Sequence, residues 1–213
     1  HTHLPQSLPL PAPTPFLILL SIPDAGRNDL YVTVCDAAFD PRGKQRPRNV
    51  EVVATLCRDD GVQLSDCISL GVGEDLVNEF SSVIYYHNNS PRWQETFKVT
   101  IDPEQFAHTH IKFCFKHCQS SQERTKNEIF CFTFMRLLDP QSRTALPDGV
   151  HEPSVYRYQK LFDSVNEGQP PYLQNTDRLE RLPKDRFTVQ TTLCSTKVCV
   201  CVSVSVCVCV CVC

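Results

Sequence analysis

Hydrophobic and polar residues alternate in several short segments between residues 28 and 187. Residues 30–34 read Leu-Tyr-Val-Thr-Val, and residues 49–56 keep the same spacing before a turn signal at 59–61. A period of two places successive side chains on opposite faces of a strand, and β-branched residues favour that conformation. Further strands are expected at 80–86, 93–101, 111–116, 129–134, 143–146 and 154–158.

No segment shows a long apolar repeat with the helical period. Short strands separated by turns therefore predict an all-β fold, an antiparallel β-sandwich of about eight strands. Residues 62–79 are ambiguous, because 64–70 could form a strand. We interpret 62–79 as a connection. The loops after the first, third and fifth strands then lie at one end of the sandwich.

Both ends of the chain differ from the middle. Residues 1–26 contain a run of Pro, Leu, Ser and Phe, all with pyrimidine-rich codons, and we expect an unstructured or mistranslated leader. A secretory signal is the competing interpretation, but the apolar run at 16–20 is short and has no basic flank. The first residue is His1, so a fragment is expected.

The C-terminal end alternates valine with cysteine or serine from Val198 to Cys213, as a translated GTGTGT repeat would. We interpret residues 188–213 as a low-complexity Val/Cys tail, prone to form β-structure and to aggregate. The predicted folded domain is 27–187, with its core strands in 28–158, and the tails are expected to be disordered or unpacked.

Composition narrows the class of protein. The 213 residues are 41% hydrophobic and 21% charged, which fits one globular domain with tails. The net charge of −3 argues against a nucleic-acid-binding domain. Six of the 13 cysteines lie in the last fifteen residues, and the other seven form no Cys-x-x-Cys pair. A reduced, cytoplasmic protein is therefore expected.

Positive charge gathers at the predicted end of the sandwich that holds the first and third loops. The first loop contains Arg42, Lys44, Arg46 and Arg48 with no acid between them, and the third contains Lys116, Arg124 and Lys126 against one acid, Glu123. Converging cations focus the electrostatic potential, and phosphate groups are the anions that they bind best. The alternative is that these are ordinary solvated loop charges.

Six short motifs occur in the order found in one protein family. They are Arg27-Asn-Asp-Leu-Tyr-Val-Thr-Val34, Arg48-Asn-Val-Glu-Val52, Val83-Ile-Tyr-Tyr-His87, Ser90-Pro-Arg-Trp93, Phe115-Lys-His-Cys118 and Leu146-Pro-Asp-Gly-Val-His151. The chain thereby resembles, over residues 27–187, the C2-type domain of the Dock (dedicator of cytokinesis) proteins, also called Dock homology region one.

That resemblance implies a function. Dock proteins are guanine-nucleotide exchange factors for Rac-, Cdc42- or Rap-type GTPases. Their C2-type domain recruits them to the plasma membrane by binding phosphatidylinositol 3,4,5-trisphosphate. The exchange domain is absent here, so the resemblance implies a non-catalytic fragment without a cofactor. The residues implied for the head group are Arg42, Lys44, Arg46, Arg48, Lys116, Arg124 and Lys126.

Other chemistry has little support in the sequence. Calcium needs six to eight oxygen ligands, and only Asp36, Asp40 and Glu123 lie near the basic loops, so calcium-independent binding is expected. His110 and Cys114 would face away from His117 on a strand, which argues against zinc. No catalytic motif is present. Two functions stay open: a lipid-recruiting module, and a protein-interaction C2 domain whose basic loops bind an acidic partner without lipid selectivity.

Overall fold

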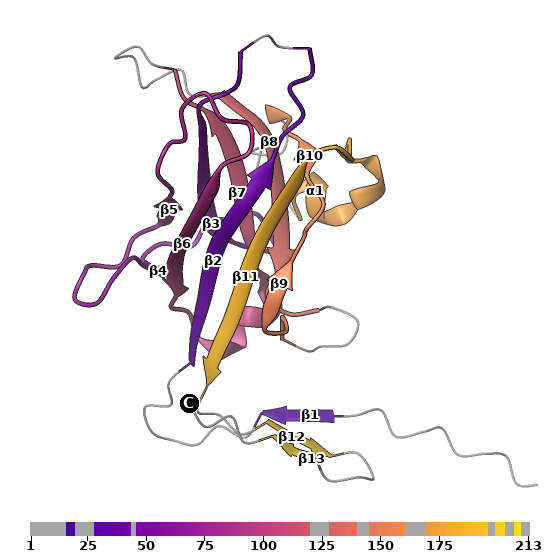
Figure 1. Cartoon of the computed structure of the whole chain (residues 1–213). Helices are drawn as coiled ribbons and strands as arrows, with labels where there is room; N and C mark the ends of the chain where they lie inside the picture. The colour runs from indigo at the N-terminus through magenta and orange to yellow at the C-terminus, as the bar shows by residue number, and fades with distance from the viewer. Residues whose placement is uncertain are drawn as a thin grey trace, which may run out of the picture. The chain divides into compact units, whose positions relative to one another are not determined.

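The computed structural model describes most of the chain (Figure 1). The described residues are 16–19, 28–43, 46–119, 128–139, 145–160, 169–195, 199–202 and 207–209. They divide into two compact units, Asn28–Cys194 and a unit formed by His1–Arg27 with Ser195–Cys213.

The larger unit is a sandwich of two five-stranded sheets, with the orders β10-β8-β7-β3-β5 and β4-β6-β2-β11-β9. The first sheet contains β3 (Val50–Arg58), β5 (Glu79–Ser81), β7 (Thr109–His117), β8 (Glu128–Arg136) and β10 (Tyr156–Arg157). The second contains β2 (Asn28–Ala38), β4 (Ile68–Ser69), β6 (Arg92–Val99), β9 (Gly149–His151) and β11 (Arg186–Ser195). Strand pairs with a described register are antiparallel. The predicted antiparallel all-β sandwich is confirmed.

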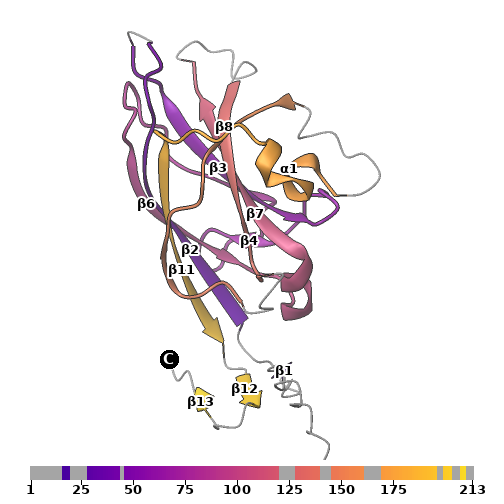
Figure 2. The same cartoon turned by 90° about the vertical axis from the view of Figure 1, so that its right-hand side faces the viewer.

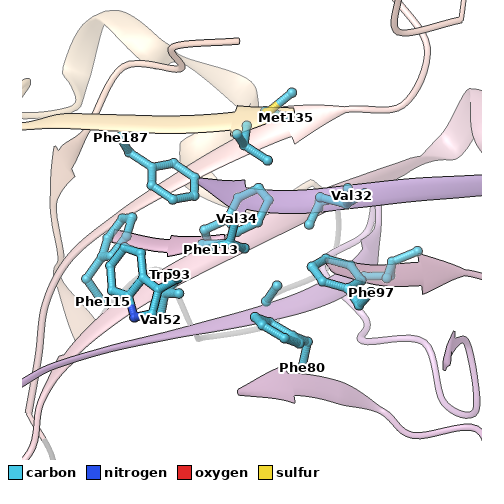
Figure 3. Packing of buried hydrophobic residues seen from close by; sticks show 14 of the residues in the cluster. Val32, Val34, Val52, Phe80, Trp93, Phe97, Phe113, Phe115, Met135 and Phe187 are labelled. Carbon is cyan, nitrogen blue, oxygen red and sulfur yellow. The ribbon is translucent and has the colours of Figure 1, made fainter. Parts of the chain in front are cut away.

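Aromatic side chains fill the space between the sheets (Figure 3). The Phe187 ring on β11 lies 5.0 Å from the rings of Phe113 and Phe115 on β7. Phe80 on β5 stacks on Phe97 of β6 with ring centroids 4.8 Å apart. These contacts join strands of opposite sheets, so the alternate positions predicted to be buried form the core.

The strand β11 corrects one predicted boundary. The folded domain was expected to end at residue 187 and its core strands at 158, but β11 continues to Ser195 within the second sheet. Phe187 and Val189 are fully buried, and Thr191 is 1% exposed. Threonines interrupt the alternation of apolar residues in β11. This strand was therefore not predicted, and its residues from 188 onward were assigned to the Val/Cys tail.

Other strand predictions need smaller corrections. The strand expected at 80–86 is only three residues long, and Tyr85 makes an isolated bridge to Val50. The strand expected at 143–146 falls partly outside the described residues, and β9 forms at 149–151 instead. The connection 62–79 contains the two-residue strand β4, which pairs with β6.

A short C-terminal segment covers the outer face of β7 and β8 (Figure 2). It contains the helix α1 (Pro171–Gln174) and a single 3-10 turn at Thr176–Arg178. Tyr172 is 2% exposed and packs with Phe132, and its hydroxyl lies 2.8 Å from Nε2 of His110. A second 3-10 helix, Pro103–His108, precedes β7. None of the helices in the described ranges has the length and apolarity needed to cross a bilayer.

The smaller unit contains the strands β1 (Phe16–Leu19), β12 (Cys199–Val202) and β13 (Cys207–Cys209). They form an antiparallel sheet in the order β1-β12-β13. The strands β12 and β13 agree with the β-propensity expected of the Val/Cys tail, whereas β1 gives residues 16–19 of the leader a regular structure. Alternating valines favour an extended backbone, which accounts for pairing within the tail.

Candidate basic lipid-binding tip

Three connections join strands at the same end of the sandwich. They are residues 39–49 between β2 and β3, 82–91 between β5 and β6, and 118–127 between β7 and β8, of which 44–45 and 120–127 lie outside the described residues. Val50, which starts β3, pairs with His117, which ends β7. The end of the first connection therefore lies beside the start of the last, as the strand count predicted. We call these connections, with the segment 182–186, the basic tip.

Asn49 joins all three connections. Its Nδ2 donates a hydrogen bond to the carbonyl of Cys118 at 2.8 Å, and its Oδ1 accepts one from the backbone N–H of His87 at 3.0 Å. Its own backbone N–H donates to Nδ1 of His117 at 3.1 Å. Asn49 is 6% exposed, so these bonds lie in a water-poor environment and fix the loops relative to one another.

Arg48 was predicted to bind the head group, but its side chain is only 4% exposed. Its guanidinium carbon lies 4.6 Å from the centre of the Phe130 ring, and Nη1 donates to the carbonyl of Asp40 at 3.3 Å. Burial, with a smaller contribution from the nearby Arg42, lowers the pKa of Arg48. These contacts show that Arg48 stabilises the conformation of the first loop.

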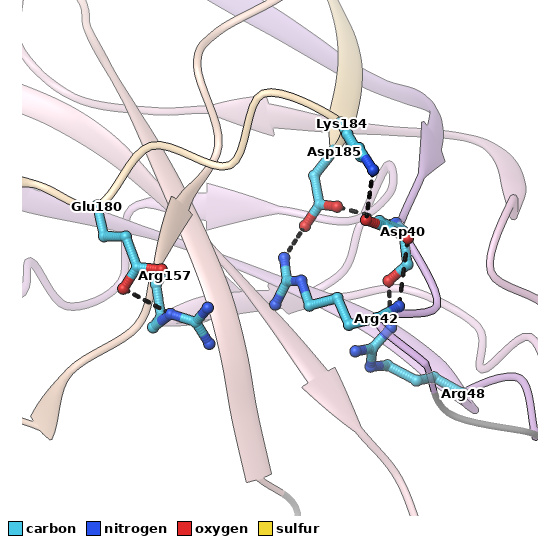
Figure 4. Close-up of polar contacts among 7 residues, drawn as sticks. All are labelled: Asp40, Arg42, Arg48, Arg157, Glu180, Lys184 and Asp185. Carbon is cyan, nitrogen blue, oxygen red and sulfur yellow. Dashed lines mark hydrogen bonds and ion pairs between the residues drawn. The ribbon is translucent and has the colours of Figure 1, made fainter.

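Arg42 belongs to a network with two carboxylates (Figure 4). Its Nη2 pairs with Oδ2 of Asp185, whose side chain is 1% exposed. The other oxygen of Asp185 accepts from the backbone N–H of Asp40 at 2.9 Å. Lys184 lies 3.9 Å from the carboxylate of Asp40 and is 80% exposed. Asp185 therefore ties the first loop to the start of β11.

The remaining predicted cations differ in their accessibility. Arg46 is exposed, and Lys116 is half-buried on β7, directly across the ladder from Glu51 of β3. Lys44, Arg124 and Lys126 lie outside the described residues. Of the predicted residues that the structure describes, Arg46 and Lys116 thus present charge at the tip without a buried ion pair.

Two cations at the tip were missed from the sequence. Lys184 lies two residues before β11, and Arg186 is the first residue of that strand. The Arg186 side chain is 57% exposed, and its Nη2 lies 3.5 Å from Oδ1 of Asp36. Because the strand itself was not predicted, its first residues were not placed at this end. The run Lys184-Asp-Arg186 after Pro183 is the signal that could have located them.

The carboxylates in and beside the tip form ion pairs with arginine or lysine side chains. Asp36 faces Arg186, while Asp40 and Asp185 take part in the Arg42 network. Within the described ranges, no three His, Cys, Asp or Glu side chains come together as a metal site. A calcium ion would have to displace these cations to obtain its oxygen ligands.

The Cys118 thiol, which lies within the tip, is poorly suited to nucleophilic chemistry. Burial, followed by the charge of Glu51, raises the pKa of the Cys118 thiol to about 11. A thiol with this pKa is protonated at neutral pH, and the thiolate is the reactive form. The tip is therefore equipped for binding anions through Arg and Lys side chains.

A family model described as "C2 domain in Dock180 and Zizimin proteins" matches residues 23–200. The chain belongs to this family. The match to this Dock-family C2 domain includes all of β11, in agreement with the structure. The resemblance inferred from the sequence motifs is confirmed.

Two relatives of this Dock-family domain illustrate the similarity. Dedicator of cytokinesis protein 4 of Mus musculus is 38% identical over 185 residues, which cover 83% of this chain and 9% of that protein. Dedicator of cytokinesis protein 3 of Homo sapiens is 35% identical over 185 residues, covering 81% of this chain and 9% of that protein. The chain thus spans about a tenth of the length of these relatives.

A solved structure with a related outline is a C2 domain of plant extended synaptotagmin 1. It covers 81% of this chain and 98% of that domain with a TM-score of 0.44 and 14% sequence identity. The fold assignment rests on the sheet topology and the family match.

Proposed function

We propose that the basic tip binds phosphatidylinositol 3,4,5-trisphosphate and thereby recruits a Dock-type guanine-nucleotide exchange factor from the cytoplasm to the plasma membrane. The observation that supports this proposal most is the hydrogen bond from Nδ2 of Asn49 to the carbonyl of Cys118, which holds the end of the first loop beside the start of the third. A head group with several phosphates needs donors from more than one direction, and two adjacent basic loops supply them.

In this proposal the cations have two roles. Arg46 and Lys116 contact the head group together with Lys44, Arg124 and Lys126, the residues implied by the family resemblance. Lys184 and Arg186 extend the cationic surface toward neighbouring anionic lipids, because both are more than half exposed.

Arg42 and Arg48 act mainly as supports of the first loop. Arg48 is buried against Phe130, and Arg42 is paired with the buried Asp185. Partial exposure of 22% still allows the Arg42 side chain to offer a donor to a phosphate at the surface.

The exchange reaction is proposed for a part of the protein outside this chain. Small GTPases of the Rac or Rap type are accordingly indirect partners, reached through that part. The domain itself brings the exchange factor to a membrane, so its binding should follow lipid composition and salt concentration.

Vesicle sedimentation tests the proposal. The chain should sediment with vesicles containing the trisphosphate lipid more than with phosphatidylserine vesicles of equal charge, with or without a calcium chelator. Arg46→Glu and Lys184→Glu should each weaken binding, while Arg58→Glu at the opposite end of β3 should not. Equal binding to both vesicles, with retained binding to an acidic protein partner, would favour the protein-interaction alternative.

A further inference from the structure

Acidic residues are concentrated on a part of the sandwich away from the basic tip. Between Arg58 and Arg92 the chain contains six acids and no lysine or arginine. Four of the acids are exposed and have no ion-pair partner among the described residues. They are Asp66, Glu74, Asp75 and Glu79. We call the surface of residues 62–79 the acidic flank.

Exposed apolar side chains are concentrated on and beside the same segment. Among the described residues, four of the seven exposed large hydrophobic side chains lie on the acidic flank: Val62, Leu70, Val72 and Leu76. Two more, Val83 and Tyr86, lie in the 82–91 connection of the basic tip. Val72 is fully exposed and Leu70 is 46% exposed. Scattered apolar residues are normal on a surface, but a concentration of them marks an interaction site.

The acidic flank is one continuous surface. Nε2 of Gln63 donates to the carbonyl of Asn78 at 3.1 Å, and Oδ1 of Asn78 accepts from the backbone N–H of Asp66 at 2.8 Å. Ile68 and Val77 form an antiparallel bridge. The two halves of the segment are therefore held together, and Figure 1 shows β4, β5 and β6 along the same side of the sandwich.

A cavity of about 410 Å³ opens beside the exposed loop. Val72 and Leu76 contribute the loop side of its lining, and Tyr31, Thr96 and Lys98 contribute the sheet side from β2 and β6. The cavity is large enough to accept an apolar side chain of a partner. It adjoins Glu74, which also belongs to its lining.

We propose that the acidic flank is a docking surface for a basic polypeptide segment that carries apolar side chains. The unpaired carboxylates complement lysine and arginine and repel an anionic bilayer or a nucleic acid. The exposed apolar side chains and the cavity supply the desolvated contacts that a purely ionic partner would not use. The flank does not include the loops of the basic tip, so the proposal stands independently of lipid binding.

Titration of the full chain with model peptides tests this inference. The probe is a short fluorescent peptide of repeated Leu-Lys-Lys-Leu units, followed by anisotropy and by amide chemical-shift changes in the labelled chain. Binding should shift the amides of residues 66–79. The double variant Glu74→Lys, Asp75→Lys should weaken binding about tenfold, because two exposed ion pairs are replaced by repulsion. Val72→Ser should also weaken it.

Matched controls separate the flank from the rest of the surface. Glu152→Lys changes an exposed acid elsewhere, and Val150→Ser changes the one exposed large apolar side chain described outside residues 62–86. Neither should alter the affinity, and an acidic Leu-Glu-Glu-Leu peptide should not bind. The proposal is overturned if the controls weaken binding as much as the flank variants, if Val72→Ser has no effect, or if the shifted amides lie elsewhere.

Discussion

Replacing Asn49 by alanine removes two hydrogen bonds that connect the loops of the basic tip without removing any charge. The carbonyl of Cys118 loses its bond at 2.8 Å, and the N–H of His87 loses its bond at 3.0 Å. Asn49 is only 6% exposed, and its side chain carries no charge. The substitution therefore tests how much binding depends on the arrangement of the loops, because their cations are unchanged.

The magnitude follows from the two backbone groups left without partners. The carbonyl of Cys118 is buried, and leaving it without a partner costs about 1–3 kcal/mol; the bond to the N–H of His87 is only partly buried, and its loss costs about 0.5–1.5 kcal/mol. The free energy of unfolding should therefore fall by about 1.5–4.5 kcal/mol. For a domain of this size, that loss corresponds to a decrease in Tm of roughly 3–18 °C. Asn49→Asp keeps an acceptor for His87 but places a buried carboxylate oxygen against the carbonyl of Cys118, so its defect should be at least as large as that of Asn49→Ala.

The single tryptophan of the chain provides the assay. Trp93 is 6% exposed, so urea unfolding followed by its fluorescence gives the free energy of unfolding. Asn88→Ala is the matched control, because among the described residues the Asn88 side chain bonds locally, accepting from the N–H of Ser90. Asn49→Ala should lower both stability and vesicle binding, with binding measured at a temperature where the variant is folded. Equal stability and unchanged binding for the two alanine variants would refute the reasoning.

Three further predictions concern the core, the pH dependence and the ion pair at the tip. Phe187→Ala should lower the free energy of unfolding by about 3–5 kcal/mol in urea titrations; a loss below about 1 kcal/mol would show that β11 is not part of the core. Burial lowers the pKa of His110 from 6.5 to about 4. The unfolded chain then binds a proton at higher pH than the folded chain, so stability should fall by up to about 3 kcal/mol between about pH 6.5 and 4, and His110→Gln should remove that part of the slope. In a double-mutant cycle, Arg42→Met and Asp185→Asn should show a coupling of at least about 1 kcal/mol, whereas strictly additive losses would contradict the ion pair.

The sandwich could be predicted because its apolar positions have a simple period. In β2 and β7, residues such as Val32 and Phe113 alternate with polar neighbours and are fully buried. In β11 that signal is weaker, because Thr191 occupies a buried position and its hydroxyl donates to the carbonyl of Pro147. A buried threonine with a partner looks like a surface residue in the sequence, so the strand was missed.

The placement of the basic loops could be predicted, but the state of each cation could not. Strand direction alone brings the first and third loops to one end. Arg48 looks like its exposed neighbour Arg46, and only the ring of Phe130, far along the chain, buries it. Asp185 was assigned no role, although it pairs with Arg42 across the tip. Such pairings depend on tertiary contacts between distant segments, which a pattern of local charges does not contain.

The central claim is that the first and third loops form one head-group site. Calorimetric titration of the full chain with the soluble tetrakisphosphate head group of the lipid tests it through Lys44→Glu, Lys126→Glu and the double variant. Each single change should weaken binding by about 1–3 kcal/mol, and the double variant should lose less than the sum, because either change alone disrupts the shared site. Small, additive losses that disappear at high salt would show independent surface charges and would contradict the account.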